Sequence, residues 1–329
     1  MKCSSLNRRD ELDFLKGFGI LLMIMGHVPI NHYAVHYIYI FHMPLFFWVS
    51  GILYRDKEQP LNQIILKYAR KLFHPYLFFA MLGSILLLLE TKMDFLECVK
   101  RIAYSVFFIN TDGMPIAGAL WYLTAIFFVY VFFIVLKKYV KRRFLQNLCI
   151  WGVFAIGLFW KRVFDFRLPW AVDVAFVGIG FYYGGYLCSV YKECLKKLLN
   201  KNGLLVVLFV LCSFGGMLNE KVSMRICEYG NGPCFAVCAF GLVLVFYRIA
   251  CEICKRRVPT TIIRRIGQRS IFYLCMNEIV INVTNSVLSK LCEGGALLVV
   301  AKFFVSLFVL IFAESFVYRF SEVKKIVGV

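Results

Sequence analysis

The stretch ALLVVAKFFVSLFVLIFAESF (296–316) decides the fold class. A helix of about 20 apolar residues is long enough to cross the ~30 Å hydrocarbon core of a bilayer. A second run, GLLVVLFVLCSFGGML (203–218), approaches this length. Both runs are continuous and do not alternate with polar residues, so they are not barrel strands. Because backbone groups in lipid must bond within their own segment, both runs are predicted to be transmembrane helices.

The composition extends this prediction to the whole chain. Hydrophobic residues make up 61% of 329 positions and charged residues 17%, and the mean hydropathy is +0.73. Such a balance does not suit a water-exposed globular surface. We therefore expect one domain over residues 1–329, an all-α polytopic transmembrane bundle of about ten spans: 14–31, 36–54, 75–90, 118–136, 145–160, 169–190, 203–218, 233–250, 268–288 and 295–317.

The distribution of positive charge predicts the orientation. The net charge is +19, and Lys and Arg gather in the loops that lie inside if the N-terminus is cytoplasmic, as in KKYVKRR (137–143) and CKRRVPTTIIRR (254–265). This is the positive-inside pattern, which places both termini in the cytoplasm. The clusters are therefore read as topology signals and contacts with anionic membrane lipids rather than as a nucleic-acid surface.

Polar residues at membrane depth are where function is expected, because a charge at the centre of a span costs ~2.5–3.5 kcal/mol. The first span, DFLKGFGILLMIMGHVPIN (13–31), contains Lys16 and His27. Eleven residues of helix bring these two side chains to nearly the same face, about 16 Å apart along the axis. Lys16 could instead extend to the membrane interface, and His27 could be a hydrogen-bonded packing residue. As a side chain that titrates near neutrality, however, His27 is the natural proton-transfer candidate.

Other polar or aromatic residues follow in later spans. His42 lies within the second span, and Arg70 and Lys71 form a basic pair at the cytoplasmic mouth of the third. Trp121 is expected at the outer interface, where an aromatic belt is the ordinary explanation. Asp173 stands inside the sixth span and needs a cation or a hydroxyl ligand.

The last two spans also carry polar residues. In the ninth span, Glu278, Asn282 and Asn285 form one stripe, for which interhelical hydrogen bonding is the simpler account. Lys302 and Glu314 are charged residues of the last span.

No metal site is expected. The histidines between positions 27 and 42 have no carboxylate or cysteine at ligand spacing. Cys251 and Cys254 form a CxxC pair without a second pair or a nearby histidine.

Six segments resemble, in order, those of the membrane acyltransferase 3 family, which includes bacterial sugar and cell-wall O-acetyltransferases. They cover nearly the whole chain: RRDELDFLKGFGILLMIMGHV (8–28), FHMPLFFWVSGILYR (41–55), RKLFHPYLFF (70–79), GALWYLTAIF (118–127), LPWAVDVAFVGIGFYYGGYL (168–187) and RRIGQRSIFYLC (264–275). Lys16 and His27 match the family's first-helix signature, a Lys or Arg, then ten residues, then His. In its short length the chain is similar to the fucose 4-O-acetyltransferase subgroup. Many relatives have a His where this sequence has Asn277, so a hydrogen-bonding role is expected there.

The resemblance implies transfer of an acetyl group from cytoplasmic acetyl-CoA to a hydroxyl of a cell-envelope carbohydrate or lipid-linked glycan, in the plasma (inner) membrane. His27 would act as general base or acyl carrier, and Lys16, Arg70 and Lys71 would hold the CoA phosphates. His42, Trp121, Asp173 and Asn277 would line the acceptor side. The alternatives are a transporter or flippase of a lipid-linked sugar or small solute, and a non-catalytic partner in an envelope complex. No inverted repeat supports the transporter.

Overall fold

The computed structural model describes residues 10–90, 94–107, 118–256, 258–291 and 295–320. Within these residues there is no β-strand, only an isolated bridge between Ser223 and Glu228. The all-α prediction is thus confirmed. The helices are α1 (Asp10–His27), α2 (His32–Ile52), α3 (Leu61–Glu90), α4 (Phe95–Phe107), η1 (Gly118–Leu120), α5 (Trp121–Tyr139), α6 (Arg143–Val163), η2 (Pro169–Ala171), α7 (Val172–Val190), α8 (Lys192–Leu199), α9 (Asn202–Leu218), η3 (Met224–Ile226), α10 (Gly232–Lys255), α11 (Thr261–Gln268), α12 (Ser270–Leu291) and α13 (Ala296–Val317).

Seven stretches of the described chain are long and apolar enough to cross a membrane. They are His32–Ile52, Gly118–Tyr139, Arg143–Val163, Pro169–Val190, Gly232–Lys255, Ser270–Lys290 and Ala296–Val317. The other three predicted spans, 14–31, 75–90 and 203–218, fall mainly on α1, α3 and α9. These helices meet the length and hydropathy requirement less well, because α1 contains several charges and α9 is only 17 residues long. A multi-pass bundle is therefore established, while the count of ten remains a prediction.

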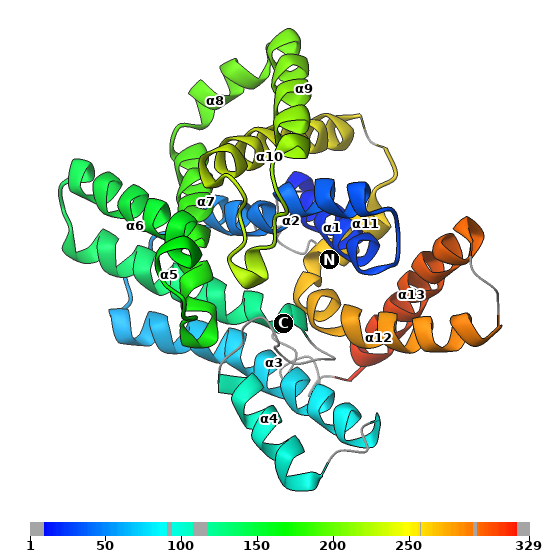
Figure 1. Cartoon of the computed structure of the whole chain (residues 1–329). Coiled ribbons are helices and arrows are strands. Elements are labelled where there is room, and N and C mark those ends of the chain that lie inside the picture. Colours follow the sequence, from blue (N-terminus) through cyan, green and yellow to red (C-terminus); the bar gives the residue numbers. More distant parts are fainter. Residues whose placement is uncertain (1–9, 91–93, 108–117, 257, 292–294, 321–329) are drawn as a thin grey trace, which may run out of the picture.

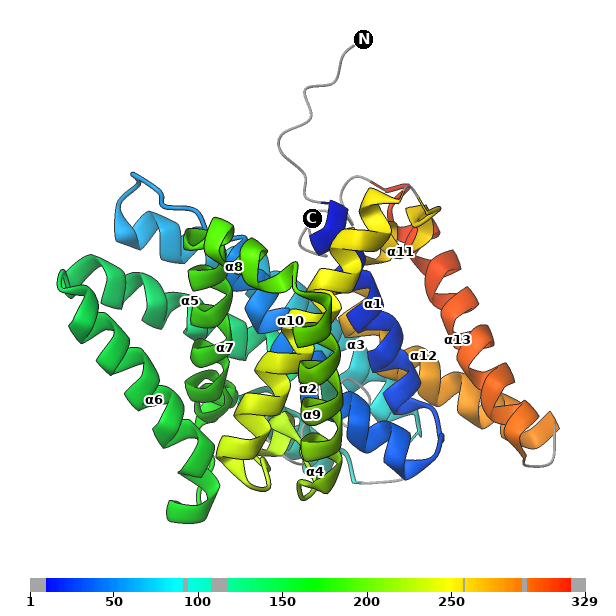
Figure 2. The same cartoon turned by 90° about the horizontal axis from the view of Figure 1, so that it is seen from above.

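Helices α7 and α9 run between two ends of the molecule in Figure 2. The start of α1, the end of α13 and the short helices α8 and α11 lie at one end. The end of α12, the start of α13 and the helix α4 lie at the other. The ends of the described chain thus share one side of the bundle, as the predicted topology requires.

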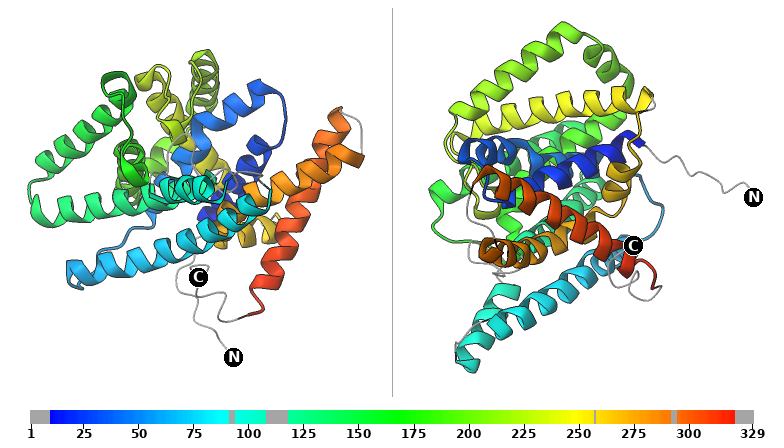
Figure 3. Two further views of the ribbon diagram at one scale, coloured as in Figure 1. Left: turned by 60° about the horizontal axis from the view of Figure 1, so that its bottom comes forward. Right: turned by 90° about the vertical axis from the view of Figure 1, so that its right-hand side faces the viewer.

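Segment 91–117 lies between two of the predicted spans, and its described part contains α4, which is strongly amphipathic. At 13 residues α4 is too short to span, and helices of this kind lie in the membrane interface. Figure 3 shows α3 and α4 projecting from the rest of the bundle.

The centre of the bundle is formed by α1, α2, α7 and α10, with α6 and α13 at opposite edges (Figure 1). Two glycine contacts bring central backbones together. A methyl group at Gly51 of α2 would lie 1.8 Å from the carbonyl oxygen of Tyr182 on α7. One at Gly17 of α1 would lie 1.9 Å from the carbonyl oxygen of Ile263 on α11. Only glycine allows this approach, which is a common form of helix packing in membranes.

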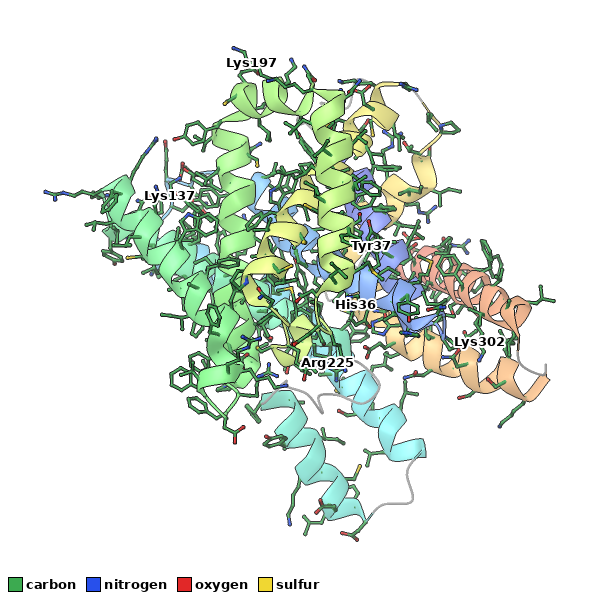
Figure 4. All side chains as sticks on the ribbon, turned by 45° about the horizontal axis from the view of Figure 1, so that its top comes forward. His36, Tyr37, Lys137, Lys197, Arg225 and Lys302 are labelled. Atoms are coloured by element: carbon green, nitrogen blue, oxygen red, sulfur yellow. The ribbon has the colours of Figure 1, made fainter. Side chains whose placement is uncertain are left out.

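The charged residues of the last span have structural partners. Glu314 is fully buried and pairs with Arg265 at 2.7 Å and with Arg269. Lys302, labelled in Figure 4, donates a hydrogen bond of 2.9 Å to the Ser289 hydroxyl on α12. Both contacts hold α13 against its neighbours and lie away from the cavities described below.

Candidate active site

A cavity of about 210 Å³ lies beside the C-terminal end of α1, within the outer half of the predicted bundle. Residues from α1, α2, the start of α5, the turn η3 and α12 line it. They are Met23, His27, Tyr39, His42, Met43, Ala119, Trp121, Ser223, Met224, Arg225, Ile226, Leu274 and Glu278. We call this space the outer cavity.

His27 and Glu278 form the central pair of the outer cavity. His27 Nε2 lies 3.7 Å from Glu278 Oε1, and 28% of the His27 side-chain surface is accessible. The second carboxylate oxygen, Oε2, accepts a hydrogen bond from the Gly118 backbone N–H. This bond orients the carboxylate toward the imidazole. A carboxylate next to an imidazole holds the ring in place and stabilises the imidazolium that forms when the ring takes up a proton.

Arg225 also lines the outer cavity, from the turn η3 between α9 and α10. A methyl group built at Gly118 would lie 2.5 Å from Arg225 Nη1 and 2.7 Å from Glu278 Oε2. The guanidinium and the carboxylate therefore flank the same glycine, and a side chain at that position would displace both.

Asp173 lies behind this turn rather than among the lining residues. It is fully buried and forms an ion pair with Arg167. It also accepts hydrogen bonds from the backbone N–H groups of Leu168 at 3.1 Å and Val174 at 2.9 Å. Arg167 Nη2 in turn donates to the carbonyl oxygen of Arg225 at 3.0 Å. The cation predicted to pair with Asp173 is thus Arg167. Through its bond to the Arg225 carbonyl oxygen, Arg167 holds η3 in position.

His42 and Trp121, both predicted on the acceptor side, do line the outer cavity. His42 is buried, and its Nδ1 forms a 2.8 Å hydrogen bond with the Ile38 carbonyl oxygen. With Nδ1 as the donor, Nε2 remains as an acceptor. Trp121 is buried and adds an aromatic surface, a common contact for sugar rings.

Asn277 is fully buried and does not line the outer cavity. Its amide donates to the Leu274 carbonyl oxygen at 2.5 Å and contacts the Met23 sulfur at 3.8 Å. This bonding fits the expected hydrogen-bonding role, and it places Asn277 between α12 and α1.

A second cavity, of about 230 Å³, lies toward the other end of α1. Lys16 and Lys71 both line it, so the structure brings these two predicted phosphate ligands together. Lys16 Nζ also pairs with Asp13 at 2.9 Å. Arg70 is exposed and does not line this space. We call it the inner cavity.

Leu274 of α12 lines both cavities. Its side chain is almost completely buried. On the inner side it is joined by Phe46 and Tyr122, whose rings lie 5.9 Å apart, and on the outer side by Met23. Leu274 therefore stands between the compartment of the lysines and the compartment of the His27–Glu278 pair.

Sequence reasoning missed two residues of this site. Glu278 was read as part of a stripe for interhelical hydrogen bonding, although a carboxylate at membrane depth is itself a functional signal. Arg225 lies in an outer loop between α9 and α10 and had no sequence signal that distinguished it from other loop cations. Among the described residues, no group of three or more His, Cys, Asp or Glu side chains is arranged to hold a metal ion.

Comparison with known proteins gives the family. The family model described as an acyltransferase domain matches residues 9–316. In the searches of curated proteins and of solved structures, no match was found. The match covers nearly the whole chain, including His27, Arg225 and Glu278, so the chain belongs to the acyltransferase 3 family and is a membrane acyltransferase.

Proposed function

We propose that the protein transfers an acetyl group from cytoplasmic acetyl-CoA to a hydroxyl of a cell-envelope carbohydrate, in the plasma (inner) membrane. The observation that carries this proposal is the His27–Glu278 pair in the outer cavity. A sugar hydroxyl is a weak nucleophile until a base takes its proton. Glu278 faces one ring nitrogen of His27, which leaves the other nitrogen for proton transfer.

The inner cavity suits the donor. Lys16 and Lys71 present two ammonium groups at the end of α1 that is predicted to be cytoplasmic. Ammonium groups form charge-assisted hydrogen bonds with phosphates. With the CoA phosphates held there, the thioester arm extends along α1 toward His27, over the roughly 16 Å that eleven helical residues span. Leu274 must move aside for the thioester to enter the outer cavity.

The outer cavity suits a carbohydrate acceptor. Tyr39, His42 and Trp121 supply an aromatic surface and hydrogen-bonding groups around His27. In the reaction, His27 accepts the proton of the acceptor hydroxyl as its oxygen attacks the thioester carbon. It then returns this proton to the leaving CoA sulfur. Glu278 stabilises the positive imidazolium between these two steps.

The test uses membranes that contain the protein, labelled acetyl-CoA and total envelope glycans. His27→Gln is expected to lower acetyl transfer by about 10²–10⁴-fold, the range of general base catalysis. The matched control is His36→Gln on α2, because His36 bonds to the Gly216 carbonyl oxygen and lies outside both cavities (Figure 4). Full transfer by His27→Gln at equal protein level would remove His27 as the base. Glycan flux across sealed vesicles without acetyl-CoA would favour the transporter.

A further inference from the structure

Arg225 reaches the outer cavity from the loop that joins α9 to α10 (Figure 4). Its guanidinium lies on the same side of Gly118 as the Glu278 carboxylate. Among the described residues that line this cavity, it is the one side chain with a permanent positive charge. The lysines of the inner cavity lie on the other side of Leu274.

The turn that carries Arg225 is held in a defined conformation. Ser223 and Glu228 exchange two backbone hydrogen bonds, of 2.7 and 3.0 Å, around η3. Cys227 adopts a left-handed conformation, with φ of 54°, to close the turn. The Arg225 carbonyl oxygen is fixed by Arg167, which Asp173 holds in turn. The backbone of Arg225 is therefore positioned before any substrate binds.

The Arg225 guanidinium has an unused donor. Its Nε is buried and has no hydrogen-bond partner among the described residues. No ion pair within 4 Å joins Arg225 to Glu278 in the described part of the chain. A buried donor without a partner costs roughly 1–3 kcal/mol, and a catalytic role is one of the reasons for which native structures keep such a group.

We propose that Arg225 is a further catalytic residue, which donates hydrogen bonds to the carbonyl oxygen of the acyl group as that oxygen becomes an oxyanion. This inference rests on the proposed function. When the acceptor oxygen bonds to the thioester carbon, the C=O electron pair moves onto the carbonyl oxygen. When the intermediate collapses, this pair re-forms the C=O bond, the carbon–sulfur bond breaks, and the sulfur leaves with the proton carried by His27.

The two ions of the site thereby have separate tasks. Glu278 balances the positive charge on the imidazolium, and Arg225 balances the negative charge on the carbonyl oxygen. A donor that is fixed before the reaction needs no reorganisation when the charge develops, and this is why such groups contribute strongly to catalysis. The planar fork of the guanidinium can also direct two N–H groups at one oxygen.

The experiment compares Arg225→Gln and Arg225→Lys with wild type in two reactions. The first is transfer of labelled acetyl from acetyl-CoA to total envelope glycans. The second is hydrolysis of acetyl-CoA in the absence of glycan, because water attacks the same carbon and produces the same oxyanion. Arg225→Gln is expected to lower kcat of both reactions by about 10²–10³-fold, with the KM for acetyl-CoA changed less than about threefold. Arg225→Lys retains the positive charge but not the planar fork of the guanidinium. Its kcat should therefore fall less than that of Arg225→Gln.

The matched control is Lys221→Gln, which removes an exposed cation from the same loop and should leave both reactions unchanged. Arg225 variants are compared at equal unfolding temperature in detergent, and Arg225→Lys is the variant on which the test depends if Arg225→Gln does not fold. A loss of transfer with unchanged hydrolysis would overturn the proposal and assign Arg225 to binding an anionic acceptor. Unchanged kcat in both reactions overturns the oxyanion role alone. A wild-type protein that neither transfers nor hydrolyses acetyl from acetyl-CoA overturns the proposed function as well.

Discussion

Glu278 on α12 lies with Oε1 3.7 Å from Nε2 of His27, the last residue of α1. The two residues come from opposite ends of the chain, and the Gly118 N–H holds the second carboxylate oxygen. The distance is longer than a hydrogen bond, so a small movement of either side chain brings the pair into bonding contact. Catalytic hydrogen bonds commonly shorten in this way when substrate binds.

The first prediction concerns this carboxylate. Glu278→Gln keeps the shape but removes the charge that stabilises the imidazolium, so kcat for acetyl transfer should fall at least about 10²-fold. The KM for acetyl-CoA should change little, since the proposed phosphate site is the inner cavity, away from Glu278. Steady-state kinetics on membranes checks this. The control is Asn282→Ala, at an exposed position of the same helix. Full activity in Glu278→Gln would contradict a catalytic role for the His27–Glu278 pair.

The second prediction concerns the cations proposed to bind the phosphates of acetyl-CoA, and it distinguishes Lys71 from its neighbour Arg70. Lys16→Gln and Lys71→Gln should each raise the KM for acetyl-CoA by about tenfold, because each removes a charge-assisted bond to phosphate. Arg70→Gln should have a smaller effect, since Arg70 is exposed outside the inner cavity. The apparent affinity for acetyl-CoA is the measurement, with Lys138→Gln, an exposed cation at the end of α5, as the control. Equal effects of all four variants would refute a localised phosphate site.

The third prediction concerns Leu274. Leu274→Trp should close the passage between the two cavities, so that acetyl-CoA still binds while acetyl transfer is lost. Overpacking costs typically 1–3 kcal/mol, so the unfolding temperature is measured alongside. Val283→Trp places the same bulk on an exposed, lipid-facing position of α12 and should remain active. Normal turnover in a folded Leu274→Trp protein would show that the donor takes another route.

The fourth prediction concerns Asp173, which the sequence placed near the acceptor. Asp173→Ala leaves the largely buried Arg167 without its counter-ion, and breaking a buried pair in this way costs about 3–5 kcal/mol. A lowered unfolding temperature in detergent is therefore expected, with a lower kcat because η3 loses its anchor.

Its control is the double variant Asp173→Ala with Arg167→Met, which removes both charges and should recover part of the stability. Asp165 is an exposed carboxylate in the loop that carries Arg167. Asp165→Asn should change neither the unfolding temperature nor kcat. An unchanged unfolding temperature in Asp173→Ala, with a raised acceptor KM, would return Asp173 to the acceptor side.

Helical periodicity in the sequence predicted how the site residues of a single helix lie relative to one another. Lys16 and His27 share α1, and helical periodicity alone places them on one face with a known separation. The need to satisfy Asp173 with a cation also followed from its depth, and the structure supplies Arg167. The amphipathic helix α4 was not predicted, because a short amphipathic segment has neither the length nor the hydropathy that marks a span.

By itself, the sequence determined the membrane environment and the fold class of this protein and singled out His27 as the candidate base, because apolar length, charge asymmetry and helical period are properties of contiguous residues. Only the tertiary structure decided that Glu278 and Arg225 join His27 and that Arg70 does not join Lys71. It also decided that Asp173 supports η3 and that Leu274 divides two cavities. These relationships depend on how distant helices rotate and pack against one another, and a period within one helix carries no information about which residue of another helix faces it.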